Sequence, residues 1–240
     1  MWKRTTRGRE LHFYLAGINN QNFLMRDRET GSWWQQVTGR AIAGELAGSA
    51  LELMPNDELT FALWKSEEPP GSSLVLAPVP GYGEKDYDKK WEQEVAKYPV
   101  PLTFPGQGLK DRDVILGVEI GGQARAFPLA KARGANPVVD KIAGVPVALV
   151  TGPDGESVRI FRSQWNGSDI ELYRAAQSDG KDAGQNPEWR LVDGQGNTWN
   201  FAGCATSGPA ASQCLEKINY LKDYWFDWKN YNPRTTVYSH

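Results

Sequence analysis

The chain has 240 residues and a formal net charge of −2, from 27 Lys and Arg against 29 Asp and Glu. This near-neutral balance lacks the basic surplus of nucleic-acid-binding proteins, so no nucleic-acid partner is expected. There are two His and two Cys but ten Trp, so a zinc site rich in histidine or a Ser-His-Asp triad is excluded unless it uses His12 or His240, the last residue. No apolar run approaches the ~20 residues that span a bilayer, and no transmembrane segment is predicted.

The N-terminal part of the chain is predicted to form short antiparallel strands. Alternating apolar residues indicate a strand over residues 11–17, and the asparagines at 19–20 suit a turn into a returning strand over 23–27. Residues 29–31 then predict a second turn. The first helix is expected over 59–66.

The C-terminal part shows the same strand-and-turn pattern. Gly121-Gly122 predicts a two-residue hairpin between strands at 114–120 and 123–127. A second hairpin is expected around the turn at 152–155, between strands at 145–151 and 157–162. Further helices are expected over 86–97 and over part of 214–228. We therefore predict a β-dominated α+β fold with a few short helices.

Proline is concentrated in the middle of the chain. Seven of the 15 prolines fall between residues 69 and 105, a density that disfavours regular structure. The aromatic residues of this proline-rich segment indicate that it packs against the rest of the protein. We therefore predict a first half over 1–78, a connector over 79–112 and a second half over 113–240, together forming one compact domain.

An internal repeat is the strongest pattern in the sequence. A strand ending in Asp, a glycine-containing turn and a tryptophan strand occur first at Asp27 to Trp34 and again at Asp193 to Trp199. Later landmarks recur in the same order, namely Leu51-Glu52 with Leu215-Glu216, and Trp64 with Trp228. We interpret these as two copies of one unit, which predicts two pseudo-symmetric halves of short antiparallel strands.

Two runs resemble a known family. The run Asp27-Arg28-Glu29-Thr30-Gly31-Ser32-Trp33-Trp34, continuing to Gly48, resembles the signature block of the domain of unknown function (DUF) 3179 family. The run from Val114 to Leu129 is similar to its other recurring block. Members are prokaryotic proteins, usually exported or lipid-anchored, with no settled activity. The resemblance implies a periplasmic or extracellular location.

The chain also departs from the family pattern. Members usually carry, ahead of the Asp-Arg block, a segment with a His-Glu pair and a Cys-Pro-x-Cys-like hairpin. This chain begins after that point, so the resemblance implies a member that lacks its N-terminal segment. In the second copy, Gly152 and Gly155 stand where the first copy of the family carries cysteines, and Ala135 stands near the position of its histidine. Chemistry that depends on those residues is therefore not expected.

The densest polar and aromatic cluster predicts a ligand-binding surface made of Asp27, Arg28, Ser32, Trp34 and Gln36. Alternate strand residues share a face, so Ser32, Trp34 and Gln36 are expected to project together. An aromatic platform beside amide and hydroxyl groups suits a carbohydrate or another planar polar ligand. The alternative is structural, with Asp27 stabilising a turn and the tryptophan filling the core.

The remaining candidates are fewer. Cys204 and Cys214 either form a disulfide in an oxidising compartment or remain two reduced thiols. His12 is expected to be solvent-facing or hydrogen-bonded. No catalytic residue, metal ligand or cofactor is predicted.

The leading hypothesis is a non-catalytic, extracytoplasmic module that binds an unknown small ligand or protein. The rival hypothesis is a hydrolase of glycans or esters that uses carboxylates near Asp27 or Asp193. The sequence does not predict the oligomeric state.

Overall fold

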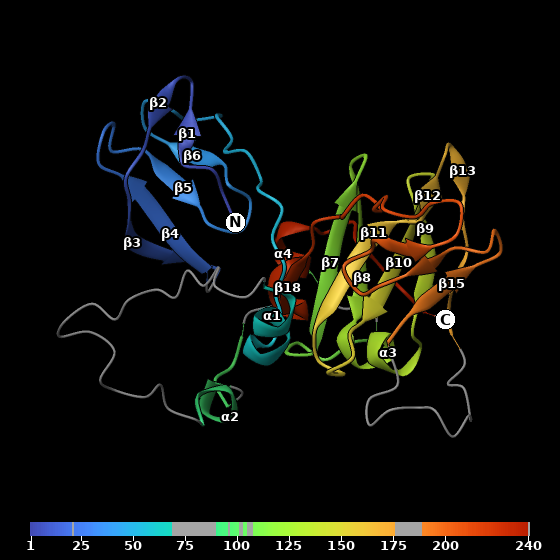
Figure 1. Cartoon of the computed structure of the whole chain (residues 1–240). Helices are drawn as coiled ribbons and strands as arrows, with labels where there is room; N and C mark the ends of the chain where they lie inside the picture. The colour runs from blue at the N-terminus through green and yellow to red at the C-terminus, as the bar shows by residue number, and fades with distance from the viewer. Residues whose placement is uncertain are drawn as a thin grey trace.

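The computed structural model describes residues 1–20, 22–68, 90–95, 97–100, 103–104, 108–175 and 189–239. Within these residues the protein is β-dominated, with several small antiparallel sheets and four short helices (Figure 1). The predicted β-dominated α+β class is therefore confirmed.

Six strands form the first segment, which we define as residues 2–53. Four of them make an antiparallel sheet in the order β3-β4-β5-β6, beside a small β1-β2 hairpin. Its core is Leu11, Trp34, Ala41, Leu46 and Leu51. The strands are β1 (Thr5–Thr6), β2 (Arg9–Glu10), β3 (Phe13–Asn19), β4 (Asn22–Asp27), β5 (Trp33–Gln35) and β6 (Ala41–Ala43).

The central body comprises residues 114–162 and 218–239. Gly121 and Gly122 have φ angles of 56° and 74°, as the predicted two-residue hairpin requires. The body contains β7 (Val114–Ile120), β8 (Gln123–Pro128), α3 (Leu129–Gly134), β9 (Val138–Ile142), β10 (Val145–Thr151), β11 (Val158–Arg162), β18 (Leu221–Tyr224), α4 (Trp225–Tyr231) and β19 (Thr236–Val237). Its two sheets have the orders β18-β7-β8-β19 and β11-β10-β9.

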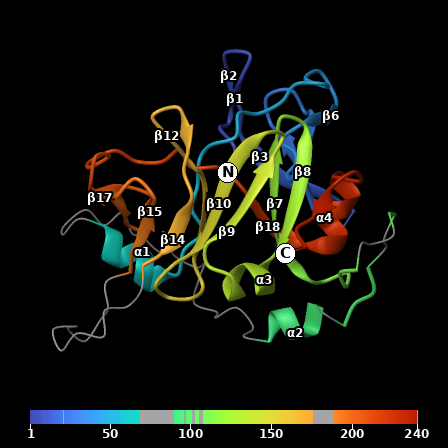
Figure 2. The same ribbon diagram turned by 90° about the vertical axis from the view of Figure 1, so that its right-hand side faces the viewer.

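The second segment, residues 163–175 and 189–217, repeats the strand order of the first. Its strands are β12 (Gln164–Trp165), β13 (Ser168–Asp169), β14 (Leu172–Arg174), β15 (Leu191–Asp193), β16 (Thr198–Trp199) and β17 (Ala205–Ser207). A small β12-β13 hairpin again accompanies a four-stranded sheet, in the order β14-β15-β16-β17. Figure 2 shows β9 and β10 between this segment and the β7–β8 hairpin.

The three expected helices are shorter than, or shifted from, their predicted spans. The first is α1 (Phe61–Glu67) and the second is α2 (Trp91–Val95). The third, α4, begins only at Trp225, because residues 221–224 are extended and pair with β7. Edge pairing to a distant strand thus overrides any local helical tendency there.

Residues 57–68 lie against the central body and the second segment. Glu58 forms a β-bridge with Val158, and the backbone N–H of Thr60 donates to Ser157 Oγ at 2.9 Å. Leu63 of α1 belongs to the same core cluster as Trp199. The predicted boundary at residue 78 and much of the 79–112 connector lie outside the described residues, so the three-part division stays a prediction.

Candidate functional site

The predicted site around Asp27 is a hydrogen-bonded turn inside the first segment. Asp27 ends β4, and Trp34 lies on the neighbouring strand β5. The indole Nε1 of Trp34 donates to Asp27 Oδ2 at 2.8 Å, while the Thr30 backbone N–H donates to Asp27 Oδ1 at 2.6 Å. Asp27, Ser32 and Trp34 are all 0% exposed, so these three side chains do not reach the surface.

The other two predicted residues are exposed. The Arg28 backbone N–H donates to His12 O at 3.0 Å. Gln36 follows the end of β5, and its carbonyl oxygen accepts Trp2 Nε1 at 2.6 Å. Ser32 and Trp34 therefore face inward while Gln36 does not, and the five residues form no continuous surface. The binding role of the set remains a prediction.

The same arrangement recurs in the second segment. Trp199 Nε1 donates to Asp193 Oδ2 at 2.9 Å, as Trp34 does to Asp27. Asn197 takes the place of Ser32, because its Oδ1 accepts the Ala210 backbone N–H at 2.7 Å, much as Ser32 Oγ accepts that of Leu46 at 3.0 Å.

Both turn aspartates are charged acceptors. Burial by itself would raise the pKa of Asp27, but hydrogen bonds from Trp34 and Thr30 outweigh it and the pKa is lowered. Burial likewise opposes hydrogen bonds from Asn197 and Trp199 at Asp193, and its pKa is lowered too. Neither carboxyl group therefore carries a proton to donate at neutral pH.

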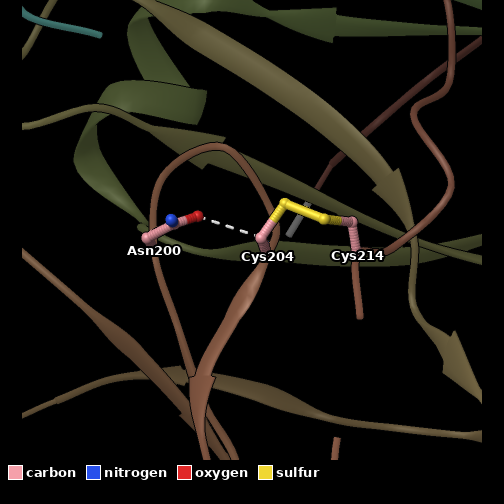
Figure 3. Close-up of a disulfide and its surroundings, with 3 residues drawn as sticks. All are labelled: Asn200, Cys204 and Cys214. Atoms are coloured by element: carbon pink, nitrogen blue, oxygen red, sulfur yellow. Dashed lines mark hydrogen bonds between the residues drawn. A yellow bond between two sulfur atoms is a disulfide. The ribbon is translucent and has the colours of Figure 1, made fainter. Parts of the chain in front are cut away.

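Cys204 and Cys214 are joined by a disulfide (Figure 3). The Cys204 backbone N–H also donates to Asn200 Oδ1 at 3.0 Å. The cysteines face each other across a β-bridge, and the first segment has a bridge at the matching place, between Arg40 and Ala50. The disulfide therefore reinforces a loop that the first segment builds without one.

A cleft of about 500 Å³ lies between the first segment and the central body. It is open to solvent and brings together residues that are far apart in the sequence. The first segment contributes the partly buried Trp2 and the exposed Gln36. The opposite wall combines aliphatic side chains such as Ile120 and Leu221 with polar and aromatic ones, which include Asn219, Tyr220, Lys222, Trp228 and Tyr231.

Three of the cations that line the cleft are paired with carboxylates, and the exposed Glu119 also lines it. Arg162 Nε lies 2.7 Å from Glu216 Oε2, Lys217 Nζ lies 2.6 Å from Asp57 Oδ2, and Lys222 Nζ lies 2.5 Å from Glu58 Oε1. These cations are already neutralised by carboxylates, so they offer little to an anion. Amide groups, aromatic rings and the Glu119 carboxylate remain as the recognition groups, which suits an uncharged polar ligand with hydroxyl donors.

Metal-ligating side chains do not gather in the part of the chain that the structure describes. No group of three or more His, Cys, Asp or Glu residues there is placed to hold an ion. His12 Nδ1 lies 2.7 Å from Glu29 Oε1, and the same glutamate accepts the His12 backbone N–H at 2.9 Å.

These features define a β-dominated protein with two similar strand segments and a polar cleft beside a central body. Residues 1–235 match the family model described as protein of unknown function (DUF3179), and the chain belongs to this family. No curated protein and no solved structure matches it. Among the described residues, no helix has the length and apolar character to cross a membrane.

Local sequence patterns do not predict the cleft. Gln36 belongs to the predicted Asp27 cluster, but Trp2 and Asn219 carry no local signal of a site. Only the placement of the first segment beside the central body brings these residues together.

Proposed function

We propose that this protein is a non-catalytic, extracytoplasmic module that binds an uncharged saccharide in the cleft between the first segment and the central body. The observation that carries the proposal is the lining of that cleft. Amides from Gln36 and Asn219 supply donors and acceptors, and Trp2, Tyr220 and Tyr231 supply aromatic surface. Sugars present apolar ring faces and a rim of hydroxyl groups, which this combination matches.

The burial and the lowered pKa values of Asp27 and Asp193 favour binding over catalysis. The rival hydrolase would use Asp27 or Asp193, yet both accept indole and amide hydrogen bonds inside the protein. A general acid needs a raised pKa and access to substrate. Their lowered pKa values and burial supply neither.

The matched contacts of the two segments support a duplicated unit. Leu51 and Leu215 each donate a backbone N–H to a glycine carbonyl, of Gly39 and Gly203 respectively, at 2.9 Å in both cases. Backbone contacts that are the same in both copies are expected of a structural scaffold, which agrees with a non-catalytic role. The disulfide supports an extracytoplasmic location, because such bonds persist in oxidising compartments.

The test is a titration of the ¹⁵N-labelled protein with glucose, N-acetylglucosamine and cellobiose, followed by NMR. We expect one of these sugars to shift amide signals of cleft residues. Gln36→Ala and Asn219→Ala should each weaken binding by about five- to tenfold, the value of one lost hydrogen bond. Gln195→Ala is the matched control, because Gln195 is an exposed amide that does not line the cleft.

Absence of cleft shifts with all three sugars would contradict the saccharide assignment. The rival hydrolase is tested with wild-type protein on glycan and ester substrates. Turnover that Asp27→Asn or Asp193→Asn abolishes, with the circular dichroism spectrum unchanged, would replace the binding proposal with the hydrolase.

A further inference from the structure

Two carboxyl groups lie together where β18 meets α4. Asp227 is in the first turn of α4 and is only 5% exposed, and Asp223 is half-buried four residues earlier. Asp223 Oδ2 and Asp227 Oδ1 are both enclosed and receive no N–H or hydroxyl donor. The two carboxyl groups interact electrostatically, and the charge of Asp227 disfavours ionisation of Asp223. Two interacting carboxylates in an enclosed site repel each other when both are ionised, so the pair retains one proton.

The pair also contacts the first segment. Asn22, at the start of β4, donates its side-chain N–H to Asp227 Oδ2. Tyr231, one turn further along α4, donates its hydroxyl to the carbonyl of Asn19 at 3.2 Å. These residues are more than 200 positions apart in the sequence. The tip of the β3–β4 hairpin is thus fastened to α4 beside the carboxyl pair.

Neighbouring cations are engaged elsewhere. On α4, Lys229 Nζ donates to Pro233 O at 2.7 Å, and on β18 Lys222 pairs with Glu58. Arg112 lies over the rings of Tyr224 and Phe226. On β7 the residue opposite Asp223 is the apolar Ile115. The described hairpin-tip residues are uncharged asparagines at 19, 20 and 22, and the remaining titratable neighbour is Tyr231.

We propose that the proton shared by Asp223 and Asp227 is a latch that holds the β3–β4 hairpin on α4, and that loss of this proton releases the hairpin. With the proton present, the pair carries one negative charge, which the Asn22 amide stabilises. Without it, two adjacent negative charges lie in a largely dry site with no cation beside them in the described structure. Separation from α4 lets water reach both carboxylates.

The direction of the pH effect follows from the proton. Burial, together with the charge of Asp227, raises the pKa of Asp223 to about 8 in the docked state. Burial raises the pKa of Asp227 as well. A released, hydrated pair returns toward the ordinary value of 3.8. The hairpin is therefore held most tightly on α4 in mild acid. The equilibrium constant for docking falls by about tenfold per pH unit as the pH rises, and this fall levels off at about pH 8.

This inference does not depend on the proposed saccharide. Tyr231 lines the cleft and also holds Asn19, so the latch and the cleft share this residue whatever ligand the cleft binds. The latch is measured on the unliganded protein, so failure of the saccharide test leaves it standing.

The test combines ¹³C NMR of the aspartate carboxyl groups with hydrogen exchange of the β3 and β4 amides, corrected for intrinsic rates, from about pH 5 to pH 9. In the wild type, one carboxyl of the pair should stay protonated above pH 6. Hairpin protection should fall as the pH rises toward about 8. Asp223→Asn and Asp227→Asn remove the second charge, so the fall in protection over this range should be much smaller than in the wild type. Asp169→Asn, at an exposed aspartate of β13, should behave as the wild type.

Three outcomes would overturn the latch. One is that both carboxyl groups titrate below pH 5. Another is that hairpin protection is unchanged while the pair loses its proton. The third is that millimolar Ca²⁺ shifts both carboxyl signals and EDTA reverses the shift, which would make the pair a cation site. Asp223→Asn keeps the test decisive if Asp227→Asn fails to fold, because Asp223 is less buried.

Discussion

Trp34 and Trp199 each donate an indole N–H to a buried aspartate, and neither has exposed surface. Each tryptophan therefore fills its core, and its indole N–H also stabilises the charge of a carboxylate that has little contact with water. Either function alone could be met by another residue, but only tryptophan combines a large apolar body with a donor at that distance.

Replacing either tryptophan by phenylalanine separates the two functions. Trp34→Phe and Trp199→Phe keep an aromatic ring but leave Asp27 or Asp193 short of one donor. We expect the free energy of unfolding to fall by about 2–4 kcal/mol in each case, from the unmet hydrogen bond and the lost ring volume. Urea denaturation followed by circular dichroism measures the change.

The control is Trp165→Phe. Trp165 Nε1 donates to Gln213 Oε1 at 2.9 Å in an exposed position, so water can replace the donor and the loss should stay below about 1 kcal/mol. Equal losses at Trp34, Trp199 and Trp165 would show that the indole–aspartate bond adds nothing beyond ring size.

At the scale of elements, the loops after β5 and β16 have the same backbone hydrogen bonds but only one has a disulfide. Ala41 donates to Ser49 O at 2.9 Å, and Ala205 donates to Gln213 O at 2.8 Å. The loop geometry therefore does not require the Cys204–Cys214 bond. The disulfide stabilises the fold by restricting the conformations that the unfolded chain can adopt.

The double variant Cys204→Ser with Cys214→Ser should keep the fold and lose about 2–3 kcal/mol of unfolding free energy, the value for a closed loop of about ten residues. Thermal unfolding with and without reducing agent measures this loss. The reciprocal variant, Arg40→Cys with Ala50→Cys, should oxidise in air and raise the melting temperature. Loss of the native circular dichroism spectrum on removal of the cysteines would contradict this account.

Local signals explain which elements could be predicted. Gly121-Gly122 has positive φ angles at both positions, and such a turn dictates its two flanking strands. The Asp-to-Trp spacing similarly reports a local turn in each segment. Non-local pairing explains why the helix expected over part of 214–228 begins late. Residues 221–224 are extended because they pair with β7, about a hundred residues earlier in the sequence.

The candidate site was harder to predict than the fold for the same reason. Strand alternation places Ser32 and Trp34 on one face, but it does not say which face is buried. Packing against Leu11 and Leu51 decides this. The cleft brings Gln36 and residues near 220 into one lining, and no local pattern encodes that arrangement.

At the scale of the whole molecule, Arg159 connects residues 57–68 to the central body. It lies on β11 and is 3% exposed. Its Nη2 lies 2.8 Å from Asp57 Oδ2 and 2.7 Å from Glu67 Oε2, while its guanidinium stands over the Phe201 ring. Planar two-sided pairing of this kind suits arginine and not lysine.

Arg159→Met should remove this connection while preserving much of the side-chain volume. Glu67 would be left partly buried without a cation, and Asp57 would keep only Lys217, so we expect a loss of at most about 3–5 kcal/mol. Lys222→Met is the matched control, because Lys222 also binds the 57–68 stretch, through Glu58, but in an exposed pair worth less than about 1 kcal/mol. Urea denaturation gives both losses, and hydrogen exchange of α1 shows whether that helix detaches first. If Arg159→Met costs no more than Lys222→Met, apolar packing around Leu63, and not the buried cation, holds α1 on the body.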